Sequence, residues 1–184
     1  WDDAKVHVLT YGLHYGLGVF EGIRCYEGNG KSAIFRLKEH IDRLFDSAKI
    51  NRMEIPFTRE QIMEACKEVL RVNKLKSAYL RPLVFVGDGE MGLVAFRNPV
   101  RVMIAAWSWG SYLGDDGINN GIRAKISSYS RYNVNGNMTR AKTCGSYINS
   151  ILAKQEALSG GYEEALLLDA EGYLAEATGE NIFV

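Results

Sequence analysis

Residues 77–89, SAYLRPLVFVGDG, form an almost unbroken apolar run that is rich in β-branched and aromatic residues and closes on a Gly-Asp-Gly turn. Such a run, bounded by turn residues, is typical of a strand buried in the middle of a sheet. Residues 100–109, VRVMIAAWSW, have the same character. The two segments predict the centre of a sheet, and their neighbours decide what surrounds it.

The segments N-terminal to this pair predict further strands and two helices. Strands are expected at 5–9 (KVHVL), 18–26 (GVFEGIRCY) and 32–36 (SAIFR), with a Gly- and Asn-rich hairpin turn at 27–31. In 37–50 the apolar residues recur at helical spacing, and a second helix begins at Thr58 with Gln61 completing a capping box. The residues that we expect these helices to bury are Leu37, Ile41, Leu44, Phe45 and Ala48, then Ile62, Ala65, Cys66, Val69 and Leu70.

The order of these elements predicts an α+β fold. Residues 1–110 form a small domain with a mostly antiparallel sheet and two helices on one face. Residues 111–135 supply a turn-rich connector and a strand at 122–130. Residues 136–184, with a helix at about 145–158 that stops at Gly160 and two strands, begin a larger β-rich domain. Seventy residues with so little core would be marginal alone, so we expect the chain to be a fragment.

Composition limits the kinds of partner. The 184 residues contain 22 basic and 22 acidic side chains, well interspersed, so nucleic acid has no basic stripe to bind. No run approaches the roughly 20 apolar residues of a membrane span. The three cysteines have no metal-ligand spacing, and no metal site is expected. Free thiols suit a reducing compartment, so we expect a soluble, cytoplasmic protein.

Lys142 stands in an unusual setting. It lies in NMTRAKTCGSYINS (137–150) among small residues, and the nearest carboxylates along the chain are Asp116 and Glu156. A lysine on a solvated helix face usually has a carboxylate three or four positions away. Lys142 is therefore either an exposed loop lysine or an amine kept nucleophilic for Schiff-base chemistry.

Two residues further along the chain, Tyr147 and Glu176, could act together with Lys142. Tyr147 is expected on the first turn of the next helix, and Glu176 lies between two strand-like pieces. An enzyme that uses pyridoxal phosphate needs a lysine, a phenol for the ring O3′ and a carboxylate for the pyridine nitrogen. The alternatives are that Tyr147 is half-buried packing and that Glu176 is a solvated strand residue.

Five blocks then resemble the branched-chain amino-acid aminotransferases, which are fold-type IV pyridoxal phosphate enzymes. In the family's order and spacing they are YGLGVFEGIRCY (15–26), FRLKEHIDRL (35–44), SAYLRPLVFVG (77–87), AKTCGSYINS (141–150) and DAEGYLAEATGENIFV (169–184). The resemblance covers nearly the whole chain. It also implies that complete chains extend beyond both of its ends.

The resemblance implies roles for individual residues. Lys142 is the Schiff-base lysine that also shuttles the α-proton, Tyr147 contacts O3′, Glu176 faces the pyridine nitrogen and Arg43 holds the phosphate. Substrate pocket residues are Tyr15, Phe20, Trp109 and Tyr112, with Tyr79 and Arg81 recognising the carboxylate. Glu21 and Arg24 are expected to pair with each other or with neighbours.

The implied activity is transfer of the amino group of leucine, isoleucine or valine to 2-oxoglutarate by a ping-pong mechanism. The implied partners are these small molecules and a second copy of the chain, in a homodimer or larger homo-oligomer. The alternatives are a D-amino-acid aminotransferase, an aminodeoxychorismate lyase or a non-catalytic fragment.

Overall fold

The computed structural model describes residues 3–94, 97–110 and 114–183, the side chains of 114–116 excepted. The chain divides into two compact units, Trp1–Trp109 with Arg140–Gly145, and Gly110–Thr139 with Ser146–Val184. Residues 140–145 therefore group with unit 1. The sequence had placed Lys142 with 136–184, but the backbone of 142–143 is bonded to a strand and a helix of unit 1.

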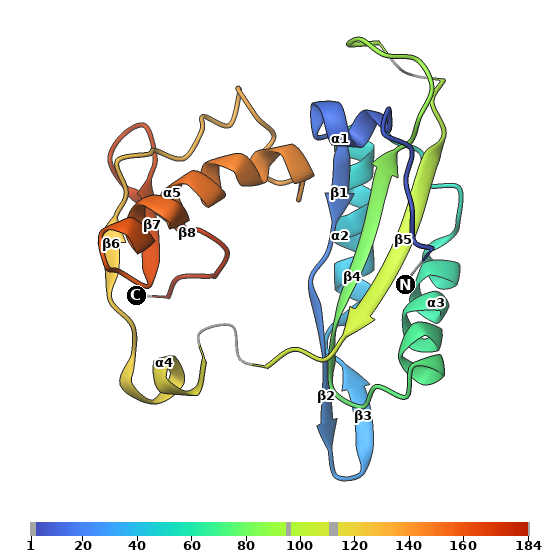
Figure 1. The fold of residues 1–184 in the computed structure, drawn as a ribbon, viewed down its shortest axis with the longest axis horizontal. Coiled ribbons are helices and arrows are strands. Elements are labelled where there is room, and N and C mark those ends of the chain that lie inside the picture. Colours follow the sequence, from blue (N-terminus) through green and yellow to red (C-terminus); the bar gives the residue numbers. More distant parts are fainter. Residues whose placement is uncertain (1–2, 95–96, 111–113, 184) are drawn as a thin grey trace. The chain divides into compact units, whose positions relative to one another are not determined.

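Unit 1 is built on an antiparallel sheet (Figure 1). Its strands are β1 Gly18–Phe20, β2 Ile23–Gly28, β3 Lys31–Ile34, β4 Ala78–Val86 and β5 Val100–Trp107. The two runs that the sequence placed at the centre pair over Tyr79–Val86 and Val100–Trp107, as β4 and β5. The central position is confirmed for β4 but is wrong for β5, which among the described strands pairs with β4 alone and lies at the edge. On the other edge of β4 lie β1 and β2, and β3 follows β2. The predicted α+β class with a mostly antiparallel sheet is confirmed.

The expected strand 18–26 is divided in two, and Pro82 explains the division. The pairs Phe20↔Leu83 and Ile23↔Leu80 keep a single register, so Glu21 stands opposite Pro82. The Glu21 N–H donates to the Pro82 carbonyl over 2.9 Å. Proline has no N–H to return the second bond of the pair, so the ladder is interrupted there.

Two 14-residue helices, α2 Leu37–Ile50 and α3 Arg59–Val72, contribute to the same core as the sheet. The predicted capping box of α3 is confirmed, with Thr58 N–H donating to Gln61 Oε1 over 2.8 Å and Gln61 N–H to Thr58 Oγ1 over 3.2 Å. Ala65 is exposed, and its expected burial is wrong. The inward stripe runs through Ile62, Cys66 and Leu70, and Ala65 falls beside it.

The first residues of the described chain differ from expectation. Residues 5–9 form no strand, and the short helix α1 Tyr11–Tyr15 follows them. An alternating pattern forms a strand only where a neighbour supplies the ladder bonds, and Val6 and Val8 are exposed here. The hairpin turn is confirmed, with Asn29 and Gly30 at φ of 51° and 73° between β2 and β3, as a type I′ turn requires.

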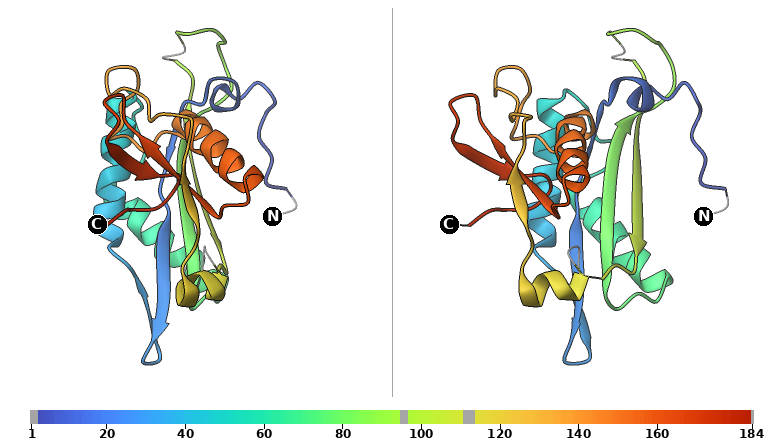
Figure 2. Two further views of the ribbon diagram at one scale, coloured as in Figure 1. Left: turned by 90° about the vertical axis from the view of Figure 1, so that its left-hand side faces the viewer. Right: turned by 60° about the vertical axis from the view of Figure 1, so that its left-hand side comes forward.

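Unit 2 is smaller. The elements that belong to it are α4 Gly114–Asn120, β6 Ala124–Ile126, α5 Tyr147–Ser159, β7 Glu164–Leu168 and β8 Leu174–Ala177, and the 3₁₀ turn η1 Cys144–Ser146 leads into α5. β7 pairs parallel with β6 and antiparallel with β8. Helix α5 packs against β7 (Figure 2), where Ala153, Ala157, Ala165 and Leu167 form the core. The expected connector contains α4, and the expected helix end at Gly160 is confirmed.

Candidate active site

The face of the unit 1 sheet that the helices do not cover carries several candidate residues. Side chains alternate between the faces of a strand. In β4 the even-numbered residues are buried on the helix side, which turns Tyr79 and Arg81 to the opposite face. Trp107 of β5 stands directly opposite Tyr79 of β4 and therefore lies on the same face.

These side chains form a connected cluster, which we call the Phe20–Arg81 cluster: Phe20, Tyr79, Arg81, Trp107 and Trp109. The Arg81 guanidinium lies 4.5 Å from the ring centre of Phe20 and donates to Tyr79 Oη over 2.9 Å. Tyr79 meets Trp109 edge to face, with ring centres 4.5 Å apart. Arg81 Nε is buried and has no hydrogen-bond partner among the described residues. A buried donor of this kind favours an anionic ligand.

The Tyr79 ring can lie where it does only because residue 22 is a glycine. A Cβ at Gly22 would lie 2.0 Å from Tyr79 Oη, so any larger residue would displace the phenol. The glycine of FEGIR therefore serves the cluster by letting the ring lie over the backbone.

Lys142 is held at the edge of this cluster by its backbone. Its N–H donates to Ser47 Oγ over 3.0 Å, and its carbonyl accepts from Phe20 N–H over 3.1 Å. The next residue, Thr143, bridges to Val19 of β1, and its hydroxyl accepts from Asn51 Nδ2 over 2.9 Å. The Lys142 side chain is partly buried, with Nζ 5.1 Å from the ring centre of Phe20.

Arg43 lies one helical turn before Ser47 on α2, and Glu21 fixes it. Its Nε and Nη2 donate to the two oxygens of Glu21 over 2.5 and 2.7 Å, and His40 Nδ1 lies 2.8 Å from Glu21 Oε2. Burial acts to raise the pKa of the Glu21 carboxyl, but the bonds from Arg43 and His40 outweigh it and lower that pKa. Glu21 and Arg24 were expected to pair with each other or with neighbours. Glu21 bonds its neighbours Arg43 and His40, while the Arg24 guanidinium lies over the ring of Tyr26.

The remaining cofactor candidates belong to unit 2. Tyr147 is the first residue of α5. Glu176 lies in β8 opposite Leu167 and forms an ion pair with Arg131. The Arg131 guanidinium also contacts the hydroxyl of Tyr132.

Two expected pocket residues are not part of the cluster as described. Tyr15 packs on Tyr11 with ring centres 4.5 Å apart, and its hydroxyl accepts from Gly92 N–H over 3.1 Å. Tyr112 lies outside the described residues.

The sequence reading missed several polar contacts of α2. His40, Arg43, Ser47 and Asn51 bond Glu21, Lys142 or Thr143, and we call these four residues the α2 polar stripe. Their spacing of three, four and four places them along one side of a helix. That spacing was a usable signal, since polar side chains recur beside the apolar face. The sequence contained no comparable signal for Trp107, which belongs to the Phe20–Arg81 cluster, or for Arg131, which pairs with Glu176.

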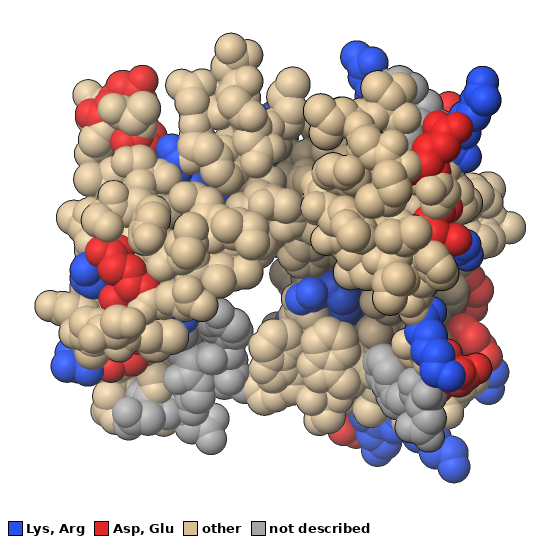
Figure 3. All heavy atoms as spheres, turned by 45° about the horizontal axis from the view of Figure 1, so that its top comes forward, with Lys and Arg blue, Asp and Glu red and all other residues tan. Residues whose placement is uncertain are grey.

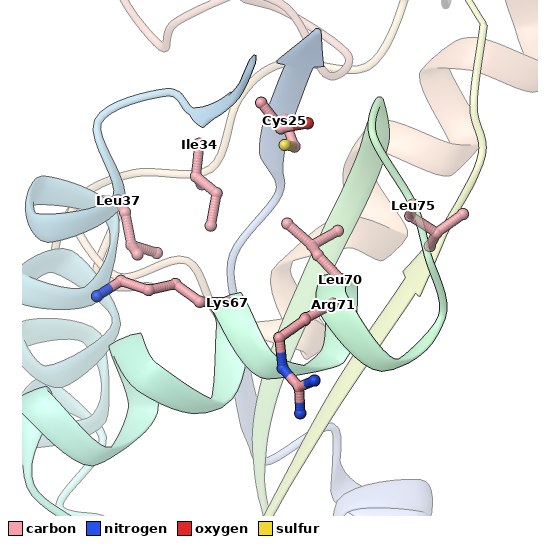
Figure 4. Close-up of a pocket in the computed structure, with 8 residues that line it drawn as sticks. Cys25, Ile34, Leu37, Lys67, Leu70, Arg71 and Leu75 are labelled. Atoms are coloured by element: carbon pink, nitrogen blue, oxygen red, sulfur yellow. The ribbon is translucent and has the colours of Figure 1, made fainter. Parts of the chain in front are cut away.

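Other features of the described chain lie apart from this site. A pocket of about 540 Å³ on the helix side is lined by Cys25, Ile34, Leu37 and Leu70, with Lys67 and Arg71 among its lining residues (Figure 4). Those two cations pair with Glu64 and Glu68. On the face in Figure 3 acidic and basic side chains are interspersed.

The described residues contain neither a metal-binding cluster nor a membrane-spanning helix. No cluster of three or more metal-binding side chains occurs among them. No helix there has both the length and the apolar character needed to cross a membrane.

Comparison with known proteins decides the family. The model of the family described as amino-transferase class IV matches residues 18–184. The chain belongs to the class IV aminotransferases. A branched-chain-amino-acid aminotransferase of Pseudomonas aeruginosa is 56% identical over all of this chain and 60% of its own length. The resemblance seen in the sequence is confirmed.

Solved structures agree. The crystal structure of the Escherichia coli branched-chain amino acid aminotransferase is similar with a TM-score of 0.94 at 48% identity, over 98% of this chain and 60% of that one. A second branched-chain amino acid aminotransferase, from T.th., is complexed with N-(5'-phosphopyridoxyl)-L-glutamate and gives 0.92 at 49% identity, over 98% and 58%. The chain thus spans about 60% of the length of these relatives.

Proposed function

We propose that the whole protein is a pyridoxal phosphate-dependent aminotransferase that moves the amino group of leucine, isoleucine or valine to 2-oxoglutarate by a ping-pong mechanism. The names of the relatives support the reaction class and the branched-chain donors. The phosphopyridoxyl-glutamate in the T.th. structure supports the cofactor and the glutamate/2-oxoglutarate couple. The observation that carries the proposal is the Lys142 amine, 5.1 Å from the Phe20 ring on which Arg81 also lies.

The residues of unit 1 fit the cofactor. In pyridoxal phosphate the aldehyde and the phosphate arm leave neighbouring ring carbons, so the amine and the phosphate-binding group must be held near each other. Ser47 bonds the backbone of Lys142, and Arg43 lies one turn away on the same helix. Side chains four apart on a helix are about 5–6 Å apart at Cβ. This spacing suits one small phosphorylated ring.

Each residue then has a chemical task. When bound, pyridoxal phosphate supplies an aldehyde that condenses with amines and a ring that withdraws electrons from the substrate's α-carbon. Lys142 provides the amine that holds the cofactor and, once released, moves the α-proton. Arg43 binds the phosphate as a planar cation. Tyr147 donates toward O3′, and Glu176 holds the proton on the pyridine nitrogen.

The Phe20–Arg81 cluster selects the substrate. Arg81, with its unpartnered Nε, and the Tyr79 hydroxyl bind a carboxylate. Phe20 and Trp109 offer apolar surface to a branched side chain. An apolar pocket distinguishes substrates by only about 1–3 kcal/mol per methylene, so we expect leucine, isoleucine and valine to overlap as donors.

We also propose that the whole protein is a cytoplasmic homodimer or larger homo-oligomer. Exposed apolar side chains near α1, including Val8, Leu13 and Tyr15, support a surface that a second copy covers. Sedimentation of the full-length protein as a monomer with undiminished activity at high dilution would contradict this.

The experiment compares Lys142→Ala with Lys67→Ala in the full-length protein. Lys67 is a lysine of α3 that pairs with Glu64 at the surface. We expect borohydride to fix the cofactor covalently to the parent and to Lys67→Ala, and transamination to be lost only in Lys142→Ala. A panel of L- and D-amino donors separates this enzyme from the D-amino-acid aminotransferase and the lyase. A Lys142→Ala variant that still turns over would overturn the assignment.

A further inference from the structure

Glu21 occupies a position that its neighbours reserve for apolar side chains. In β1 and β2, Val19, Ile23 and Cys25 point toward the helices and are fully buried. Glu21 continues this row between them and is also 0% exposed. An ionised carboxylate is costly to bury unless charges and hydrogen bonds compensate it. A purely structural requirement would be met better by an apolar residue.

The groups that compensate the buried Glu21 carboxylate come from one helix, α2, and the main one is Arg43. Both Glu21 oxygens accept from the Arg43 guanidinium, over 2.5 and 2.7 Å. Because an ionised carboxylate only accepts hydrogen bonds, the 2.8 Å contact assigns the proton of His40 to Nδ1. A two-point bond fixes the guanidinium plane as well as its position. The Arg43 side chain is nevertheless 49% exposed, so its orientation is fixed where a ligand can approach.

We propose that Glu21 is a positioning residue: it orients Arg43 for the phosphate group of the cofactor, with His40 holding the second oxygen. This rests on the proposed function, in which Arg43 binds that phosphate. Pre-orienting the arginine removes the entropy that a free side chain would lose on binding. Glu21 itself, buried behind the arginine, acts on the phosphate through Arg43.

The test separates the phosphate from the rest of the cofactor. Full-length apoprotein and its Glu21→Gln variant are titrated with pyridoxal 5'-phosphate and with pyridoxal, which lacks the phosphate, and binding is followed by absorbance. Glutamine keeps the shape but loses the charge. We expect the affinity for pyridoxal phosphate to fall about tenfold or more, which is about 1.4 kcal/mol at the standard conversion, and that for pyridoxal to stay within about twofold. Equal losses for both ligands, or no loss, would overturn the proposal.

Two further variants make the result decisive. Glu68→Gln is the matched control, because Arg71 binds Glu68 through the same two nitrogens on the surface of α3, and it should change neither affinity. If circular dichroism shows that Glu21→Gln does not fold, His40→Gln is titrated with the same two ligands in its place. We expect its affinity for pyridoxal phosphate to fall relative to its affinity for pyridoxal, by a smaller factor than in Glu21→Gln. A parent that binds pyridoxal phosphate no better than pyridoxal, or gives no borohydride-stable product, would refute the proposed function itself.

Discussion

Helices α2 and α3 have the same length and much the same construction, yet they use their polar residues differently. Each has 14 residues and an asparagine as its C-cap, and the residue after the cap has a positive φ, Arg52 at 56° and Lys74 at 54°. Aligned from their first residues, the α2 polar stripe of His40, Arg43, Ser47 and Asn51 corresponds to Ile62, Ala65, Val69 and Asn73 in α3. At the first three of these positions a polar residue of α2 corresponds to an apolar residue of α3, and the fourth is asparagine in both.

Most polar groups of α3 bond within α3 itself, and the exception is its first residue, Arg59, which pairs with Asp42 of α2. The capping box of α3, its Lys67–Glu64 pair and its Arg71–Glu68 pair all lie within the helix and its cap. Those of α2 reach Glu21, Lys142 and Thr143, which lie far away in the sequence. Helix α3 therefore supports the sheet, while α2 also fixes the candidate active site.

The largest expected difference between the helices concerns their arginines. Arg43→Gln leaves the fully buried Glu21 without its main partner, and we expect unfolding in urea to become easier by about 3 kcal/mol. Arg71→Gln breaks a pair that is open to solvent and should cause no resolvable change. Both variants are measured in the full-length protein. Equal urea midpoints would show that the burial of Glu21 has no energetic consequence.

A second difference should appear in the pH dependence of stability. The pKa of Glu21 is lowered in the folded state, so its ion pair stabilises the protein above the ordinary carboxyl pKa of 4.5 and this contribution is lost as the pH falls below it. Glu21→Gln should therefore flatten the fall in melting temperature below pH 4.5. The pKa of Glu68 is lowered too, by Arg71, but that pair is exposed. Glu68→Gln should therefore cause no resolvable change with or without 1 M salt, while the effect of Glu21→Gln should persist in 1 M salt. Loss of the Glu21→Gln effect in salt would contradict this.

The fold was predictable wherever one segment carried its own signal. Apolar runs gave β4 and β5, helical spacing gave α2, and Thr58 with Gln61 gave the start of α3. The prediction of a strand at residues 5–9 was wrong because a strand depends on a pairing partner, which the local sequence pattern does not reveal. The division of the 18–26 strand depends on Pro82, some sixty residues away, so no reading of 18–26 alone could give it.

The candidate site was predictable residue by residue but not as a network. Resemblance gave Lys142, Phe20, Tyr79 and Arg81, which the structure brings together in unit 1. The links that hold Lys142 in place come from Ser47 and Asn51, more than ninety residues earlier in the chain. The spacing of Ser47 and Asn51 marks one side of the helix, but it does not show which distant group each of them bonds, because serine and asparagine are also ordinary surface residues of helices.

The smallest and most closely matched difference lies at the two helix ends. Asn51 Nδ2 donates to the Ser47 carbonyl over 2.9 Å, as Asn73 Nδ2 does to the Val69 carbonyl over 2.8 Å. Only Asn51 also donates to a distant group, the Thr143 hydroxyl beside Lys142. Replacing each asparagine by alanine removes the same capping bond, so the difference between the two variants isolates the bond to Thr143.

We expect Asn51→Ala to cost about 1 kcal/mol more than Asn73→Ala in the free energy of unfolding, the usual net value of one partly buried hydrogen bond. Asn51→Ala alone should also slow the reaction of pyridoxal phosphate with Lys142, because the 142–143 segment loses one of its anchors on α2. Stopped-flow absorbance of the full-length apoprotein measures this rate. Thr143→Val, which removes the acceptor, is the reciprocal variant and should slow it similarly. If Asn51→Ala and Asn73→Ala react at the same rate, α2 fixes Lys142 through Ser47 alone.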